Sequence, residues 1–457
     1  MSEYDTIAYP GYPFAQTHPD RLGAIARLHG LEPAPPAGSR VLEIACGDGS
    51  NLIPMAYGMP GARFLGIDYA AQPVETGRRA AAELGLGNIE LCRADILEFE
   101  DEGPFDYILA HGLYSWVPAA VQERTLEICR RSLAPHGVAF ISYDTLPGGY
   151  ERQVVRDLMA FHATSGEPEQ RLRDAKEILA FAAKEANPQR SYGQGLMTEW
   201  KRLEGRDAGF VYHDHLAPQH EALYLTEFVR RAQKAGLAYL GEADYSEMSS
   251  SFLSPEAAAR VEDFARGDRI RREQYLDYLK GRQFRQTLLV RAERQIEEAR
   301  PERIAEMLVT SPAREEEPGV FRRGQGRLRS QHPLTRVMMQ QLGRAWPAAV
   351  RACDLASTES DRKIVYELLL VCFERGFVDL HIWQPSFTRQ PSAQPVASAV
   401  ARREAAMRRR LVGNLWHALV EVEEAARELL LKLDGSYAPA PDDPLVARLA
   451  RQALLIQ

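Results

Sequence analysis

The chain has 457 residues, of which 45% are hydrophobic, and a formal net charge of −7 at pH 7. This length predicts two or three domains, and the apolar content excludes wholesale disorder. The mildly acidic balance argues against a general binder of nucleic acid or anionic membranes, so we expect no nucleic-acid partner.

The five cysteines are scattered without a CxxC pair. They provide no zinc spacing and no disulfide framework, so we expect no metal site. The first residues, MSEYDTIAYPGYPF, lack the charged and then apolar run of a secretory signal, and no apolar run is long enough to span a membrane. A soluble protein of the reducing cytoplasm, without a membrane span, is the simplest interpretation.

From residue 40 to residue 143, short apolar runs alternate with helical patterns. Strands are predicted at RVLEIAC, ARFLGID, IELCRAD, FDYILAHG and GVAFISYD. The segments NLIPMAYGM, AQPVETGRRAAAELGL and VQERTLEICRRSL are predicted to be helices. Alternation at this spacing indicates βαβ units, and therefore a parallel sheet with helices on both faces.

The chain from Glu151 to about Arg206 carries mostly helical signal and no convincing strand. Mixed signal then returns, with a helix in EALYLTEFVRRAQKAGL, a strand in LAYLGEA, helices in PEAAARVEDFAR and REQYLDYLK, and a strand in FRQTLLVRA. We therefore predict one seven-stranded sheet interrupted by two insertions.

Beyond residue 299 a new unit begins. The segment SPAREEEPGVFRRGQGRLRSQHP reads as a linker or exposed loop, and KIVYELLLVCFERGFVDLHIW as the helix, turn and strand of a small winged-helix-like module. The segment QPSFTRQPSAQPVASA is predicted to be a linker. The last sixty or so residues are predicted to be helical, with one apolar stripe made by Leu415, Leu419, Val422, Ala426 and Leu430.

The stretch VLEIACGDGSNLIPM places two glycines, Gly47 and Gly49, directly after the first strand. Glycines there allow a sharp turn and a close approach to a ligand, although a structural turn or a dinucleotide site would also fit. Asp68 ends the second strand about twenty residues further on, where a carboxylate can bind the hydroxyls of a ribose. Leu52 stands where a dinucleotide fingerprint needs a small residue, which disfavours NAD. Asp95 could accept a hydrogen bond from an adenine amino group.

These residues resemble the class I S-adenosylmethionine-dependent methyltransferases, whose first motif is acidic-x-G-x-G-x-G. This chain has Glu43, Ala45, Gly47 and Gly49 in that pattern, with Ala45 in place of the first glycine. The resemblance implies a Rossmann-like seven-stranded fold whose last strand is antiparallel, and S-adenosyl-L-methionine as cofactor. The cofactor-binding residues that it implies or that the strand ends suggest are His18, Glu43, Ala45, Gly47, Gly49, Asn51, Asp68, Tyr69, Asp95, Ile96, Ala110, His111 and Gly112.

A narrower resemblance covers most of the chain. Segments such as HGLYSWVP, ISYDTLPGG and YLDYLKGRQFRQTLL are similar to bacterial proteins that join this fold to a methyltransferase regulatory domain, including rickettsial protein-lysine methyltransferases that act on outer-membrane proteins. That resemblance implies a protein or peptide substrate, for which a cell-envelope protein is one candidate. It also implies a homodimer formed through the helical insertion. Asp144 stands where the family usually has Asn, and we expect a carboxylate there to attract a cationic amine.

Methyl transfer needs a positioned nucleophile, and aromatic rings can hold an ammonium or methylammonium by cation–π contact. The candidate catalytic residues at the strand ends are Tyr114, Trp116, Tyr143 and Asp144. For Trp116 packing is the alternative, and for Tyr143 a place in the core is equally open. For Asp144 strand-end chemistry is favoured over a structural role.

The N-terminal arm, with Tyr9, Tyr12, Phe14 and His18, could cover the cofactor as a lid, although Phe14 could pack and His18 could merely cap the next helix. The triplet HDH at 213–215 is interpreted as a surface loop and not a metal site. The basic run ARREAAMRRRL is interpreted as the solvated face of a helix.

We therefore predict an α/β fold, Rossmann-like and seven-stranded, with helical insertions and a C-terminal, mostly helical, winged-helix-like domain. The predicted parts are the arm and cofactor-binding core, the insertion, the completion of the sheet with the regulatory region, the winged-helix-like domain and the C-terminal helices, at 1–150, 151–209, 210–298, 299–390 and 391–457. The expected activity is N-methylation of lysine side chains in a protein or peptide. The alternatives are a small-molecule or natural-product-peptide methyltransferase and a non-catalytic member that binds S-adenosylmethionine.

Overall fold

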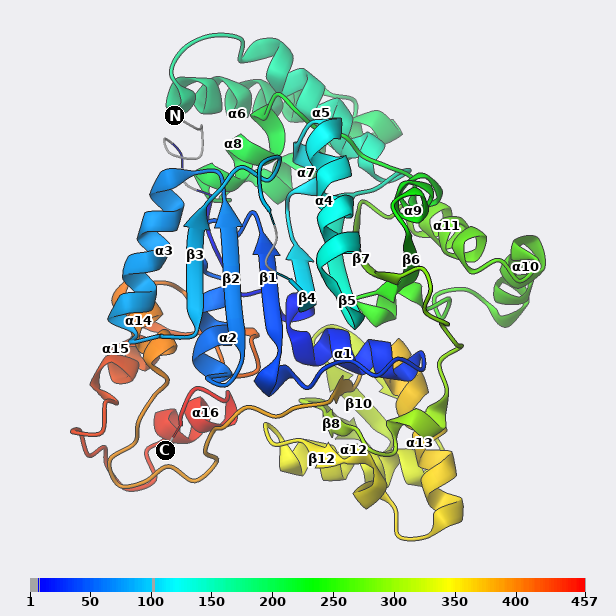
Figure 1. Cartoon of the computed structure of the whole chain (residues 1–457), viewed down its shortest axis with the longest axis vertical. Coiled ribbons are helices and arrows are strands. Elements are labelled where there is room, and N and C mark those ends of the chain that lie inside the picture. The colour runs from blue at the N-terminus through cyan, green and yellow to red at the C-terminus, as the bar shows by residue number, and fades with distance from the viewer. Residues whose placement is uncertain (1–6, 8, 101–102, 457) are drawn as a thin grey trace.

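The computed structural model describes residues 7, 9–100 and 103–456. A seven-stranded sheet forms its centre, in the order β3-β2-β1-β4-β5-β7-β6 (Figure 1). Strands β1 to β5 pair in parallel, whereas β7 is antiparallel to both β5 and β6. The predicted seven-stranded fold and its antiparallel last strand are confirmed. The strands are β1 Arg40–Ile44, β2 Arg63–Asp68, β3 Ile89–Arg93, β4 Phe105–Ala110, β5 Leu133–Asp144, β6 Leu237–Glu242 and β7 Phe284–Arg291.

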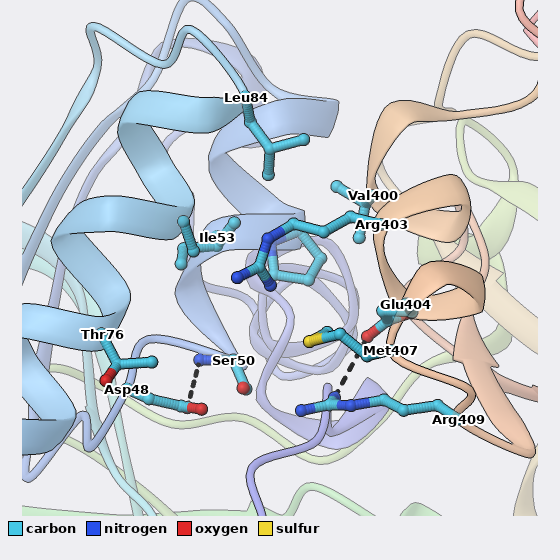
Figure 2. A pocket seen from close by; sticks show the side chains of 12 residues that line it. Asp48, Ser50, Ile53, Thr76, Leu84, Val400, Arg403, Glu404, Met407 and Arg409 are labelled. Carbon is cyan, nitrogen blue, oxygen red and sulfur yellow. Dashed lines mark hydrogen bonds and ion pairs between the residues drawn. The ribbon is translucent and has the colours of Figure 1, made fainter.

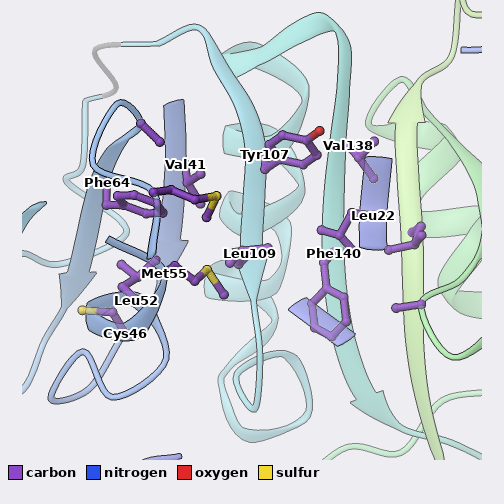
Figure 3. Packing of buried hydrophobic residues seen from close by; sticks show 14 of the residues in the cluster. Leu22, Val41, Cys46, Leu52, Met55, Phe64, Tyr107, Leu109, Val138 and Phe140 are labelled. Carbon is purple, nitrogen blue, oxygen red and sulfur yellow. The ribbon is translucent and has the colours of Figure 1, made fainter. Parts of the chain in front are cut away.

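Helices cover both faces of this sheet because successive strand residues point to opposite sides. Val41 belongs to the hydrophobic cluster under one set of helices, and its neighbour Leu42 to the cluster on the other face. Figure 3 shows the first cluster, in which Val41, Phe64 and Phe140 pack together with helix residues. The flanking helices are α1 Pro19–Leu28, α2 Leu52–Gly58, α3 Ala71–Glu83, α4 Ala119–Ser132, α9 Leu225–Lys234 and α11 Arg269–Lys280. Helix α10 Pro255–Ala265 packs against α11 at the periphery (Figure 1).

The insertion after β5 is helical, as the sequence predicts, and has a hydrophobic core of its own. It lies at the end of the sheet where the parallel strands finish (Figure 1). Its helices are α5 Gly149–His162, α6 Pro168–Glu185, α7 Ser191–Leu203 and α8 Ala208–Leu216. The triplet at 213–215 lies on α8, and His213 and His215 are buried, so the predicted surface loop is wrong. Among the described residues, no group of His, Cys, Asp and Glu is arranged to hold a metal.

The C-terminal third departs from the sequence prediction in two places. The charged segment interpreted as a linker forms a small antiparallel sheet of β9 Arg314–Glu317, β10 Val320–Arg323 and β11 Gly326–Arg329. Its turns use Gly319 and Gly324 with positive φ, and its apolar residues, such as Phe321, face the core while the charges face water. A second sheet joins β8 Leu308–Thr310, β12 Val350–Arg351 and β13 Asp379–His381, with α12 Pro333–Ala345 and α13 Glu359–Glu374 beside it.

The last residues are not one helical stripe. A hairpin of β14 Leu411–Gly413 and β15 Leu419–Glu421 interrupts them, so that Leu419 is exposed while Val422 and Leu430 are buried. The helices of this C-terminal hairpin unit, residues 397–456, are α14 Ala399–Ala406, α15 Glu424–Lys432 and α16 Pro444–Arg451. The helical period of 3.6 residues therefore misassigned a stripe whose members come from the hairpin turn, from β15 and the residue after it, and from α15.

Helix α1 joins the C-terminal third to the sheet. It lies between the sheet and the small sheets of that third (Figure 1), and its Leu22 and Leu28 belong to different cores on its two sides. Asp20 fixes the contact, because its carboxylate accepts from the backbone N–H groups of Ile382 and Trp383 at 2.7 and 2.8 Å. Within the described ranges, no helix is long and apolar enough to cross a membrane.

Candidate active site

The loop after β1 turns through three residues in the left-handed region. Ala45, Gly47 and Gly49 have φ values of 60°, 55° and 70°. Glycine adopts this region freely, whereas a residue with a Cβ pays about 1–2 kcal/mol. Ala45 therefore keeps the turn of the missing first glycine at a modest cost, and the loop of the motif is preserved.

Asp68, at the end of β2, faces this loop. Its Oδ2 accepts from the backbone N–H of Gly47 at 2.9 Å, and its Oδ1 accepts from Ala70 at 2.8 Å. The structure thus brings together two residues that the sequence places in one site. The carboxylate holds the loop in place while lying where the ribose hydroxyls are expected.

Glu43 is the most unusual residue of the site, because its carboxyl is buried at 3% exposure. Its Oε1 accepts from Asn51 Nδ2 at 2.7 Å, and its Oε2 has no hydrogen-bond partner among the described residues. Burial raises its pKa to about 8, against the lowering effect of the Asn51 hydrogen bond. A buried carboxyl with one unpaired oxygen fits the cationic methionine end of S-adenosylmethionine, whose ammonium would donate a hydrogen bond to that oxygen.

The N-terminal arm packs over this loop. A Cβ on Gly11 would come within 2.5 Å of both Asp48 Oδ1 and Ser50 Oγ, so the arm approaches as closely as a backbone can. The Phe14 ring lies 4.0 Å from that of His111, between centroids. This placement is compatible with the predicted lid, which remains a prediction.

His18 begins α1 as its N-cap, and its Nδ1 accepts from the backbone N–H of Asp20. It is buried, stacks on Trp383 and has its pKa lowered to about 4 by burial. The capping alternative is therefore the role that the structure shows.

The end of β4 contributes Ala110, His111 and Gly112. Ser142 of β5 links His111 and Gly112, because its Oγ accepts from Gly112 N at 2.9 Å and lies 3.0 Å from His111 Nδ1. Burial lowers the pKa of His111 to about 4, so its ring is neutral. Ser142 was not predicted, although its place one residue before Tyr143 in a strand whose end forms the site is the signal that could have found it.

The expected adenine side lies after β3. Asp95 Oδ1 accepts from Leu97 N at 2.9 Å, and Ile96 is half-buried against the core under α4. Tyr69 is exposed, with the Arg93 guanidinium 6.0 Å from its ring centroid. The structure places these residues at the ends of adjacent strands, as the sequence reasoning requires, and their adenine-binding role remains a prediction.

Two of the predicted catalytic residues are core residues. Tyr114 and Tyr143 are each 1% exposed and pack on Phe228 of α9, Tyr143 with ring centroids 4.1 Å apart. The Tyr143 hydroxyl pairs with Thr287 Oγ1 at 3.2 Å. Because alternate residues of β5 face opposite sides, Ser142 meets His111 while Tyr143 points into the core under α9. Both tyrosines are therefore core residues of this structure, which is the packing alternative for Tyr143, and the catalytic role expected of them stays a prediction.

Asp144 is engaged by neighbouring side chains. Its Oδ2 lies 2.9 Å from His220 Nε2, and its Oδ1 pairs with Arg152 at 3.2 Å. Trp116 packs beside them, 4.8 Å from the His220 ring, with the Arg156 guanidinium over its face at 5.2 Å. Within the protein the Asp144 carboxylate already pairs with the Arg152 guanidinium, and its expected attraction for a substrate amine stays a prediction.

Two hollows adjoin the site. A small one of about 60 Å³ separates the glycine loop and α3 from α14, where Asp48 and Ser50 face Arg403 and Arg409 (Figure 2). A wide hollow of about 690 Å³ lies at the ends of β6 and β7 and reaches α13. Phe284 lines this wide hollow, and its ring lies edge-on to that of His111 with centroids 6.1 Å apart. One wall residue of the wide hollow, Phe284, therefore contacts the residue that follows β4.

Comparison with known proteins agrees with this geometry. Residues 41–137 match a methyltransferase domain, and residues 207–291 match a predicted methyltransferase regulatory domain. The Rickettsia prowazekii protein RP028 is 35% identical over 234 residues, covering 50% of this chain and 94% of its own. RP789 from the same organism is 35% identical over 289 residues, covering 63% of this chain and 52% of its own, so the match spans about half of that relative.

The fold has a solved counterpart. PKMT2 from Rickettsia typhi superposes with a TM-score of 0.86 at 24% identity, over 98% of this chain and 100% of that one, and a structure of it in complex with AdoHcy gives 0.85. The fold and the motif loop define a methyltransferase that uses S-adenosylmethionine. More narrowly, the chain belongs to the family of such methyltransferases that carry a methyltransferase regulatory domain.

Proposed function

We propose that this protein N-methylates lysine side chains of a protein or peptide. The observation that carries the proposal is the wide hollow, which is open, is lined by charges of both signs and reaches His111 through the ring of Phe284. A polypeptide presents both charges and fills an open surface, whereas drug-sized small molecules are usually enclosed in largely apolar pockets. PKMT2 carries the name of a protein-lysine methyltransferase, and the sequence resembles rickettsial enzymes of that kind.

The acidic groups of the wide hollow suit a lysine. Glu247 already pairs with Lys280 and Arg282, at 3.8 and 3.4 Å. Glu374, at the end of α13, makes no ion pair among the described residues, and burial raises its pKa. Arg272 and Arg375 lie near enough to oppose this rise, yet neither forms an ion pair with Glu374 among the described residues. The carboxylate can therefore still pair with a substrate ammonium, and Glu374 is the group that we assign to the lysine.

Methylation requires the lysine amine to be neutral when it attacks. When bound, S-adenosylmethionine supplies the electrophilic methyl group. The hollow lets the ammonium proton leave to water, and the aromatic wall of Phe284 and Phe252 lowers local polarity, which favours the neutral amine. His111 is a poor base at neutral pH because burial lowers its pKa to about 4, so we do not assign it to deprotonating the lysine, and its cofactor-binding role stays a prediction.

The test is incubation with S-adenosylmethionine carrying a labelled methyl group and a cell lysate, followed by peptide mass spectrometry. We expect label on lysine Nζ of polypeptides. Label confined to small molecules would favour the second class of substrate, and no label from a protein that binds AdoHcy would indicate a non-catalytic member.

With the labelled polypeptide identified, Glu374→Gln is expected to raise its KM on the order of tenfold, with kcat less affected. Glu359→Gln is the matched control, since Glu359 lies at the exposed start of the same helix and pairs with Lys363. Equal KM values for the two variants would remove Glu374 from the acceptor site.

We also propose that the protein is a homodimer formed through the helical insertion. Large apolar side chains are exposed along α5, α6 and α7, with Phe161 at 83% and Phe181 at 61%. An exposed apolar surface of this kind is typical of a protein interface. Phe161→Glu is expected to halve the mass measured by light scattering, while Phe264→Glu, on exposed α10, leaves it unchanged. A location in the cytoplasm stays a prediction from the sequence.

A further inference from the structure

The C-terminal hairpin unit reaches the cofactor loop through one histidine. His417 lies in the turn between β14 and β15, 2% exposed, with φ of 58°. Its Nε2 is 2.9 Å from Asn51 Oδ1. Non-glycine residues are uncommon in this left-handed region. The turn is thus shaped so that the ring enters the cofactor site, more than 360 positions away in the sequence from Asn51.

The direction of this hydrogen bond follows from the backbone. The Phe14 N–H, which can only donate, reaches Asn51 Oδ1 at 3.0 Å. That contact identifies Oδ1 as the oxygen of the amide and leaves Nδ2 toward Glu43. His417 must therefore donate from Nε2, as a neutral ring protonated on that nitrogen. Burial, with His18 and Arg21 nearby, lowers the pKa of His417 well below its usual value, in agreement with a neutral ring.

The chain of contacts ends at the unsatisfied atom of the site. Asn51 Nδ2 donates to Glu43 Oε1 at 2.7 Å, and the other oxygen of that carboxyl has no partner among the described residues. Rotation of the Asn51 amide would turn Oδ1 toward Glu43, and with the carboxylate ionised, as it must be to receive an ammonium, two acceptors would face each other. A donor that fixes the amide therefore fixes which oxygen of Glu43 is free.

A second contact of the same unit holds the arm that carries Phe14. Arg409 Nη1 donates to the backbone oxygen of Gly11 at 3.0 Å, and its guanidinium lies 5.6 Å from the Tyr12 ring centroid. Glu404 orients Arg409 at 3.4 Å (Figure 2). The C-terminal hairpin unit thus holds Asn51 directly, through His417, and indirectly, through the arm.

We propose that His417 is a positioning residue of the S-adenosylmethionine site. It acts through Asn51 to present the free oxygen of Glu43 to the ammonium of the methionine end. The C-terminal hairpin unit is then a working part of the cofactor site, and its docking sets the affinity for the amino-acid end of the cofactor. This inference depends on the cofactor and is independent of whether the acceptor is a lysine.

A matched pair of variants tests the hydrogen bond. In His417→Gln the amide nitrogen extends to about the place of Nε2, whereas in His417→Asn it stops one methylene short. Asn tolerates the left-handed region well, so His417→Asn is expected to fold. Trp416→Phe is the control, because it loses a neighbouring hydrogen bond to Pro347 O in the same turn without touching Asn51.

Calorimetry then compares two ligands, AdoHcy and 5′-methylthioadenosine, which lacks the amino-acid end. We expect His417→Asn to weaken AdoHcy about 3- to 10-fold and to leave 5′-methylthioadenosine unchanged. His417→Gln and Trp416→Phe should bind both ligands like the wild type. Equal weakening of the two ligands, or equal behaviour of His417→Asn and His417→Gln, would overturn the proposal.

A double-mutant cycle gives a second, independent check. Asn51→Leu removes the intermediary, so adding His417→Asn to it should cause no further loss of AdoHcy affinity. If the fold-losses of AdoHcy affinity in the two single variants multiply in the double variant, His417 acts independently of Asn51 and the proposal is wrong. Because the cycle measures binding of AdoHcy alone, its outcome is separate from any failure of the lysine proposal.

Discussion

The two halves of the same sheet edge use their polar residues differently. At β1 and β2, Glu43 and Asp68 converge on the glycine loop, and Glu43 keeps one oxygen without a partner among the described residues. At β5, the residues that the sequence suggests as reactive contact other side chains of the protein. Tyr143 packs on Phe228, and Asp144 pairs with His220 and Arg152. The difference teaches that a motif with fixed spacing marks a site, whereas reactive residue types at a strand end do not.

The largest effect is expected at the glycine loop. In Gly49→Val, a β-branched residue would have to hold φ of 70°, with its Cβ 3.0 Å from Leu91 Cδ1. We expect AdoHcy binding to fall more than about 100-fold in calorimetry. Gly85→Val is the control, because Gly85 has φ of 65° in open space at the end of α3. Equal loss in both variants would mean that backbone strain alone is responsible.

The next largest effect is expected for Glu43→Gln, which removes the buried charge. A charge-assisted hydrogen bond is worth about 1.5–3 kcal/mol, so AdoHcy should bind about 10- to 100-fold more weakly at pH 9. The ionised form of Glu43 is the one that receives the ammonium. Wild-type affinity should therefore rise as the pH passes through about 8, the raised pKa of this carboxyl, and the variant should lose that rise.

The same substitution, Glu43→Gln, is expected to weaken ligand binding but to raise the stability of the fold at pH 8. The folded pKa of Glu43, about 8, lies above its ordinary value of 4.5, so the folded state binds the extra proton. Stability contributed by this group is complete below pH 4.5 and is lost as the pH rises toward 8. Glu43→Gln should therefore melt at a higher temperature than the wild type at pH 8 and differ little at pH 4.5. Lower stability of the variant at pH 8 would contradict a strained carboxyl.

A smaller effect is expected for Asp144→Asn, which introduces the residue that the resembling family usually carries. The variant removes the ion pair with Arg152 and leaves a partly buried cation, at a cost of about 1–3 kcal/mol in chemical denaturation. AdoHcy binding should stay within about twofold, because Asp144 belongs to the His220 cluster and not to the cofactor loop. A large change in AdoHcy affinity would show that Asp144 contributes to the cofactor site.

The smallest effect is expected for Tyr143→Phe. It loses the hydroxyl contact with Thr287 and should cost about 1 kcal/mol of stability. Its kcat/KM on the identified substrate should remain within about twofold of the wild type, since the ring packs under α9. Phe228→Leu, which removes its stacking partner, is expected to cost more stability with the same small effect on activity. A large loss of activity in Tyr143→Phe alone would restore the catalytic assignment.

Much of the fold could be predicted because its signals are local. The alternation of apolar runs with helical patterns predicted the sheet, and the strand FRQTLLVRA has the antiparallel place expected of the last strand. Predictions failed where local pattern and tertiary context conflict. The segment from Arg314 to Arg329 is charged and glycine-rich like a linker, yet one buried face, with Phe321 and Leu328, is enough to form a three-stranded sheet.

The sequence by itself determined the cofactor edge of this protein, because spacing along β1 and β2 carries Glu43, the glycines and Asp68 to adjacent strand ends. Only the tertiary structure decided which reactive groups remain available. Whether Tyr143 faces a ligand or the core depends on the pleat of β5, and the hydrogen-bond partner of Asp144, His220, lies 76 positions away. His417 lies 366 positions from Asn51, and no local pattern links them. Burial and long-range hydrogen bonds arise from packing, so a periodicity or a motif spacing cannot reveal them.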